Sequence, residues 1–181
     1  HAKTHRCVEI AKRQIAAGAV GICCAKLGEA EIFAGEGIED ILITSPVVTA
    51  TGLARLLALN SRIGALKQVV DDASVVEALA ARIDDKPLTV LIDTDPGTHR
   101  TGVAAVEQAL TVAEAIRASE GKLVYGGVQF YCGSEQHIED WTERRAAIAE
   151  RQAHAQSIID ALSAGGFAPP VITGAGTGTH A

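Results

Sequence analysis

Short runs of apolar residues alternate along this chain with longer segments in which apolar positions recur every three or four residues. The short runs are apolar at consecutive positions, which is typical of parallel strands that are covered on both faces. The longer segments have the spacing of helices that bury one face. The predicted strands are Ala19–Cys24, Asp40–Thr44, Leu66–Val70, Leu88–Asp93, Leu123–Tyr131 and Pro170–Thr173, and the predicted helices are Thr4–Ala17, Gly28–Glu36, Val48–Ser61, Ala73–Asp84, Val103–Ser119 and Glu139–Ala164.

This unbroken series of strand and helix units predicts an α/β protein with a parallel sheet, either doubly wound or part of a (β/α)8 TIM-type barrel. A doubly wound dinucleotide-binding sheet carries GxGxxG after its first strand, and the first predicted strand is not followed by that pattern. Polar and charged residues instead follow almost every predicted strand, where a barrel places its chemistry. The pattern therefore favours the barrel.

The predicted barrel is incomplete. Lys3 precedes the first predicted helix, which is where a preceding strand would end, and the chain stops in a glycine-rich loop. We expect a first strand before His1 and an eighth strand after Ala181. Residues 1–181 are thus interpreted as part of one barrel domain within a longer protein.

The composition and net charge of the chain argue against several kinds of protein. The 181 residues are 48% apolar, which excludes wholesale disorder, and the net charge of −6 is the opposite of what a nucleic-acid-binding face needs. The longest uncharged apolar stretch, Ile15–Ala25, is about half the length of a membrane span. The four cysteines form neither a disulfide framework nor a CxxC metal pattern, which favours a reducing compartment and a cytoplasmic location; they are Cys7, Cys23, Cys24 and Cys132.

The glycine-rich segment after the last predicted strand is a candidate phosphate site. Glycines let backbone N–H groups approach a ligand, and the loops after the last strands of a barrel commonly bind phosphate. The alternative is an ordinary flexible loop. The residues expected to form the site are Thr173, Gly174, Gly176 and Thr177.

Lys3 and Arg100 are candidate ligand-binding residues. Lys3 lies between His1 and His5, and a lysine with a lowered pKa forms Schiff bases with carbonyl compounds, including pyridoxal phosphate. Arg100 follows a strand and could hold an anionic oxygen through its planar guanidinium. The alternatives are a solvated surface lysine and an ordinary turn, in which Asp93 and Asp95 would serve as capping residues.

The segment QFYCGSEQH collects polar groups directly after a strand. The phenol of Tyr131 could bind a ring nitrogen of a cofactor, and His137 could act as an acid or base near neutral pH. A structural role for His137 is the alternative.

In this order, the segments HAKTHRC, AVGICCAKLGEAE, GIEDILIT, VLIDTDPGTHRTGV, GVQFYCGSEQH and VITGAGTGT resemble the D-threonine aldolase and D-serine dehydratase family. These are pyridoxal-phosphate enzymes of the alanine-racemase type (fold type III). The resemblance implies that Lys3 forms the Schiff base, that Arg100 faces the phenolic oxygen of the cofactor and that Tyr131 approaches its pyridine nitrogen. It also implies that the glycine-rich run binds the phosphate. Cys132 stands where aldolase relatives often carry histidine.

The same resemblance implies a lyase that cleaves a β-hydroxy-D-amino acid, such as D-threonine, to glycine and an aldehyde. We expect His137 to act as a base near the substrate hydroxyl. Dehydration of D-serine or 3-hydroxy-D-aspartate is the alternative on the same scaffold, and a non-catalytic or structural barrel is the alternative of another class. The family pattern further implies a divalent metal (Mn, Mg or Zn) with ligands in a C-terminal β-domain outside this chain, and a homodimer of the full-length protein.

Overall fold

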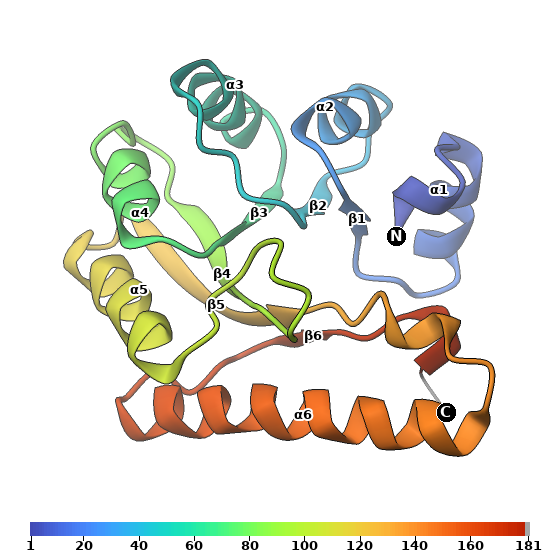
Figure 1. The fold of residues 1–181 in the computed structure, drawn as a ribbon. Helices are drawn as coiled ribbons and strands as arrows, with labels where there is room; N and C mark the ends of the chain where they lie inside the picture. Colours follow the sequence, from blue (N-terminus) through green and yellow to red (C-terminus); the bar gives the residue numbers. More distant parts are fainter. Residues whose placement is uncertain (180–181) are drawn as a thin grey trace.

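The computed structural model describes residues 1–179 and contains one parallel sheet of six strands. The strands lie in chain order from one edge of the sheet to the other, and Figure 1 shows the sheet curling with the helices on its outer side. A doubly wound sheet would instead reverse its strand order near the middle. The predicted barrel architecture is therefore confirmed as an open, incomplete barrel. Its strands are β1 (Ile22–Cys24), β2 (Asp40–Ile43), β3 (Ala65–Val70), β4 (Leu88–Thr94), β5 (Leu123–Phe130) and β6 (Ile172–Gly174).

Helices and strands alternate along the chain, beginning with α1 before β1, as the periodicity predicts. They are α1 (Val8–Ala16), α2 (Leu27–Gly35), α3 (Ala50–Asn60), α4 (Ala73–Ala80), α5 (Val106–Ala118) and α6 (Trp141–Ala164). Three short 3-10 turns stand at the ends of the strands or before α1, and they are η1 (Ala2–Thr4), η2 (Glu135–His137) and η3 (Thr177–Thr179).

The starts of two helices, α1 and α5, differ most from the prediction. The segment predicted as one helix from Thr4 is interrupted at Arg6, which has a positive φ of 47°, and α1 begins only at Val8. Val103, predicted as the start of a helix, instead pairs with Thr94 of β4 as an isolated bridge. In both places the chain is held by contacts with the strand ends, and these override local helix propensity.

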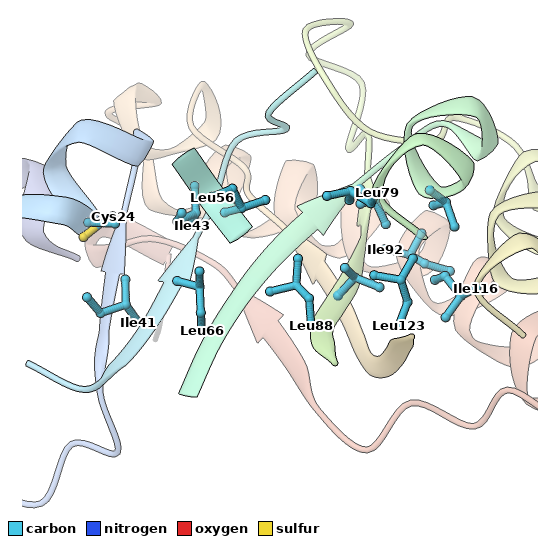
Figure 2. Packing of buried hydrophobic residues seen from close by; sticks show 14 of the residues in the cluster. Cys24, Ile41, Ile43, Leu56, Leu66, Leu79, Leu88, Ile92, Ile116 and Leu123 are labelled. Carbon is cyan, nitrogen blue, oxygen red and sulfur yellow. The ribbon is translucent and has the colours of Figure 1, made fainter. Parts of the chain in front are cut away.

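The core lies between the sheet and the helices. Side chains alternate along each strand, so that Ile41, Ile43 and Leu66 face the helices, while Leu42, Val69 and Leu91 pack together on the concave face with Cys23. Figure 2 shows the side chains between the sheet and the helices, where strand residues contact helix residues that include Leu56, Leu79 and Ile116. This packing holds the strands in place, and it therefore also positions their carboxyl ends, which the polar residues follow.

The last strand joins the sheet through a close backbone approach. Gly127 of β5 has a positive φ of 121°, and a Cβ atom there would lie 1.9 Å from the carbonyl oxygen of Val171. The amide of Val128 donates to that same oxygen at 2.9 Å. Only glycine fits at position 127, and this contact brings the glycine-rich loop after β6 next to the end of β5.

None of the helices in the described part of the chain combines the length and the apolar character that a membrane crossing requires.

Candidate active site

A cavity of about 370 Å³ lies at the carboxyl ends of the strands. Its volume lies within the range of small-molecule sites, about 300–1,000 Å³. Segments far apart in the sequence meet in its wall. The lining includes Lys3, Arg100, Tyr131, Thr173, Gly174, Gly176 and Thr177, which are seven of the eight predicted site residues.

Lys3 is held at the cavity by a hydrogen-bonded turn. Its backbone N–H donates to Nδ1 of His1 at 3.3 Å, and Nε2 of His1 lies 3.0 Å from Oγ1 of Thr44. The Thr44 hydroxyl donates to the carbonyl oxygen of Cys24 at 3.2 Å. Since Thr44 uses its proton there, His1 is the donor to Thr44. The turn is therefore tied to the ends of β1 and β2.

The amine of Lys3 lies over the ring of Tyr131, with Nζ 4.4 Å from the ring centroid. A cation over an aromatic face is attracted by the ring quadrupole. The hydroxyl of Tyr131 accepts a hydrogen bond from Nε2 of Gln136 at 3.0 Å. The predicted lysine and the predicted ring partner are thus neighbours in space, although 128 positions separate them in the printed sequence.

The carboxylates of Asp93 and Asp95 accept hydrogen bonds from the loop that carries Arg100. One oxygen of Asp95 accepts from the backbone N–H groups of Gly97 and Thr98, each at 2.8 Å. Asp93 accepts from the Thr101 hydroxyl at 2.9 Å. Asp95 thus has the turn-forming role that the sequence suggests. These hydrogen bonds order the residues on both sides of Arg100, whose side chain is exposed.

The two aspartates have opposite protonation behaviour. Burial raises the pKa of Asp93 to about 6, and the charge of Asp71 acts in the same direction, whereas hydrogen bonds from Thr101 and Gln129 and the charge of Arg100 oppose the shift. Burial also disfavours the charged form of Asp95. There, however, the donated backbone N–H groups outweigh burial and hold the pKa below its ordinary value.

The loop after β6 contributes Ala175, Gly176 and Thr177 to the cavity wall. At the end of β6, a Cβ at Gly174 would lie 2.1 Å from the carbonyl oxygen of Phe130, so β6 can approach β5 this closely only with glycine. Ala175 has a positive φ of 61°. The amide of Gly176 donates to Oγ1 of Thr179 at 3.1 Å. A phosphate oxygen bound at Gly176 would have to take the place of that hydroxyl.

His137 differs from the other predicted residues. Its side chain is exposed and is not part of the cavity lining. Cys132, close to it in sequence, is fully buried, and burial raises the pKa of its thiol to about 11. The thiol is therefore protonated near neutral pH. The proposed role of His137 as a base stays a prediction.

Sequence reasoning does not single out two residues in the cavity wall. Gln136 contacts Tyr131, and Gln129 donates through Nε2 to Asp93 at 2.9 Å. A buried glutamine on a core strand is unusual, and this is the signal that could identify Gln129. Gln136 precedes the more conspicuous His137, and its contacts arise only from folding.

Within residues 1–179, no group of three or more histidine, cysteine, aspartate or glutamate side chains is arranged to hold a metal ion.

Comparison with known proteins shows what the chain resembles. It is 39% identical over 186 residues to a D-threonine aldolase of an Arthrobacter species, an alignment that covers 99% of this chain and 47% of the relative. It is 35% identical over 182 residues to a D-threo-3-hydroxyaspartate dehydratase of Delftia sp. strain HT23, with the same coverage of 99% and 47%. The chain thus spans about half the length of these curated relatives.

Solved structures agree with the sequence comparison. The crystal structure of a D-threonine aldolase from Filomicrobium marinum superposes with a TM-score of 0.93 at 36% identity, covering 99% of this chain and 48% of that one. Residues 1–180 match the family described as alanine racemase, N-terminal domain. With this match over the predicted barrel, the chain belongs to the alanine racemase N-terminal domain family.

Proposed function

We propose that this chain forms the cofactor-binding barrel of a pyridoxal-phosphate-dependent lyase that cleaves a β-hydroxy-D-amino acid to glycine and an aldehyde. The observation that carries the proposal is the meeting of Lys3, Arg100, Tyr131 and the glycine-rich loop in one cavity. Pyridoxal phosphate has an aldehyde, a phenolic oxygen, a ring nitrogen and a phosphate. The cavity wall offers an amine, a guanidinium, a phenol and a glycine loop, and these match the four groups.

When bound, the cofactor supplies a carbonyl group that takes up an amine and a ring that withdraws electrons from the substrate. Lys3 would hold the carbonyl carbon of the cofactor through its amine nitrogen. Arg100 would pair with the phenolic oxygen, and its loop is already ordered by Asp93 and Asp95. Tyr131 would bind the ring nitrogen. Preordering of this kind lowers the entropic cost of binding.

The glycine-rich loop would bind the phosphate. Thr173, Gly174, Gly176 and Thr177 all line the cavity. Short side chains and absent Cβ atoms leave room for a tetrahedral anion next to backbone N–H groups. Two or more phosphate oxygens held in this way would fix the position of the cofactor independently of Lys3.

The substrate class follows from the relatives and is part of the proposal. One relative in the comparison is an aldolase that is named for D-threonine, and another is a dehydratase that is named for D-threo-3-hydroxyaspartate. The second relative supports dehydration as an alternative reaction of the same site. We further propose a divalent metal (Mn, Mg or Zn) with ligands outside these 181 residues, a homodimer and a cytoplasmic location.

The test uses the full-length protein. Borohydride reduction of the holoprotein followed by peptide mass spectrometry should find the cofactor fixed to Lys3. Lys3→Ala should abolish the fixation and the turnover, whereas Lys26→Ala is the control, because Lys26 is exposed after β1 and is outside the cavity. Fixation to another lysine, or full turnover of Lys3→Ala, would overturn the assignment.

Product analysis separates the candidate reactions. Glycine with an aldehyde supports the aldolase, and ammonia with a keto acid supports the dehydratase. A protein that takes up no pyridoxal phosphate at all would be the structural barrel.

A further inference from the structure

Gln136 connects two loops at the cavity. Its Nε2 donates to the hydroxyl of Tyr131 at 3.0 Å, and its Oε1 accepts from the backbone N–H of Gly178 at 3.2 Å. The first contact lies in the loop after β5, and the second reaches the loop after β6, 42 residues away. Gln136 also lines the cavity.

These two partners fix the orientation of the amide. A backbone N–H can only donate, so the oxygen end of Gln136 has to face Gly178. Rotating the amide by half a turn would place two donors against each other. The nitrogen end therefore has to face Tyr131, and this conclusion follows from the partners themselves.

The glycines of the second loop are shaped around the same side chain. A Cβ at Gly176 would lie 2.3 Å from Cδ and from Oε1 of Gln136, and a Cβ at Gly178 would lie 3.3 Å from Cβ of Gln136. Glycine at position 176 is thus required for contact with Gln136 as well as for an approach to a ligand. The proposed phosphate loop and the proposed ring partner are held in one hydrogen-bonded unit.

We propose that Gln136 is a positioning residue that directs the hydroxyl proton of Tyr131 into the cavity. A phenol oxygen that accepts from Gln136 keeps its own proton for another partner. Lys3 lies over the ring face, 4.4 Å from its centroid, and in its ammonium form it presents only donors. The proton is therefore available to a hydrogen-bond acceptor that enters the cavity.

The inference rests on the proposed function for the identity of that acceptor, which is the ring nitrogen of pyridoxal phosphate. A ring nitrogen that faces an O–H donor accepts with its lone pair and stays unprotonated. A protonated nitrogen would place two donors against each other, so the site selects the neutral ring. A neutral ring withdraws electrons less strongly, which suits a reaction driven by removal of a proton from the substrate hydroxyl.

The test is ¹⁵N NMR of the full-length protein loaded with ring-¹⁵N pyridoxal phosphate. The wild-type ring nitrogen should have the chemical shift of an unprotonated pyridine around neutral pH. In Gln136→Glu, the carboxylate accepts from both Gly178 and the Tyr131 hydroxyl, and this reverses the hydrogen bond to Tyr131. The phenol oxygen then offers a lone pair to the ring, and the pKa of the ring nitrogen should rise by about one unit or more.

Controls separate this effect from added charge. Gln14→Glu adds the same charge on the exposed face of α1 and should leave the nitrogen unchanged. The double variant Gln136→Glu with Tyr131→Phe should lose the increase, because the phenol transmits it. An increase of the same size without the phenol would assign it to the charge and overturn the proposal.

The wild-type spectrum alone can also overturn the proposal, since a protonated ring nitrogen there contradicts it whatever the variants do. If Gln136→Glu does not take up cofactor, Gln136→Met removes both hydrogen bonds, and an unchanged nitrogen resonance in that variant would likewise count against the role. Failure of the wild type to bind cofactor through Lys3 would instead refute the proposed function. The two outcomes are therefore distinguishable.

Discussion

Asp93 and Asp95 stand two residues apart at the end of β4, and both are 4% exposed, yet their pKa values move in opposite directions. The difference lies both in how strongly each carboxyl group is desolvated and in its hydrogen-bond partners. Asp95 receives backbone N–H groups, which stabilise its charge, whereas Asp93 receives only one hydroxyl and one amide. Desolvation, helped by the charge of Asp71, therefore dominates at Asp93, whereas the backbone donors dominate at Asp95.

Because the pKa of Asp93 is raised in the native protein, its ionisation lowers the free energy of unfolding as pH rises. The native protein holds the Asp93 proton up to about pH 6, while the unfolded chain releases it near 3.8. The native state thus binds more protons between these values, and the free energy of unfolding falls with rising pH by about 3 kcal/mol at most. Asp93→Asn should remove this contribution, which urea unfolding at about pH 4 and about pH 7 would measure.

The control for this prediction is Asp85→Asn, because Asp85 is exposed. It should leave the pH dependence of unfolding as it is in the wild type. An Asp93→Asn protein whose free energy of unfolding falls as steeply as that of the wild type would show that Asp93 titrates normally.

Asp95 has the opposite effect. Its lowered pKa contributes stability above its ordinary value of 3.8 that is lost as pH falls through the folded value. Asp95→Ala leaves the amides of Gly97, Thr98 and His99 without their acceptor. The expected cost is about 1–3 kcal/mol in the free energy of unfolding. Since this loop carries Arg100, cofactor affinity should fall as well, whereas Asp85→Ala should change neither quantity.

The sequence predicts the barrel architecture well because its signals are local. Consecutive apolar positions identify the strands, and every strand is found close to its predicted place. The start of α1 is wrong because nothing in HAKTHRC marks the break at Arg6, which depends on contacts of the preceding turn with the ends of β1 and β2.

The site is predictable only in part. Lys3, Arg100, Tyr131 and the glycine-rich loop carry recognisable chemistry, and the family resemblance gives each of them a specific role. Gln136 carries no such signal, because its role depends on Gly178 from a loop that folds against it. His137, its neighbour, has the more conspicuous chemistry but faces solvent.

Gly176→Ala should weaken cofactor binding. The added Cβ would lie 2.3 Å from Gln136, so either the loop or the glutamine must move. We expect the dissociation constant of pyridoxal phosphate to rise about tenfold or more, which corresponds to ~1.4 kcal/mol. Gly28→Ala is the control, since a Cβ there meets nothing within 4 Å. Absorbance titration of both apoproteins with the cofactor would measure the difference, and equal affinities would contradict the close contact at position 176.

The two tyrosines of the chain provide a matched pair for the final prediction. The hydroxyl of Tyr131 is bonded to Gln136 and lies at the cavity, whereas that of Tyr125 is buried without a hydrogen-bond partner among residues 1–179. Tyr131→Phe removes one hydrogen bond to the ring nitrogen, worth about 1 kcal/mol, so the dissociation constant of the cofactor should rise severalfold.

The aromatic ring under Lys3 is kept in Tyr131→Phe, so the change isolates the hydroxyl. Tyr125→Phe should leave cofactor affinity unchanged and should not lower the melting temperature, because it removes a buried polar atom that has no partner. Absorbance titration and thermal unfolding of both variants would measure these effects. Equal affinities of the Tyr131→Phe and Tyr125→Phe proteins would show that the Tyr131 hydroxyl does not bind the ring.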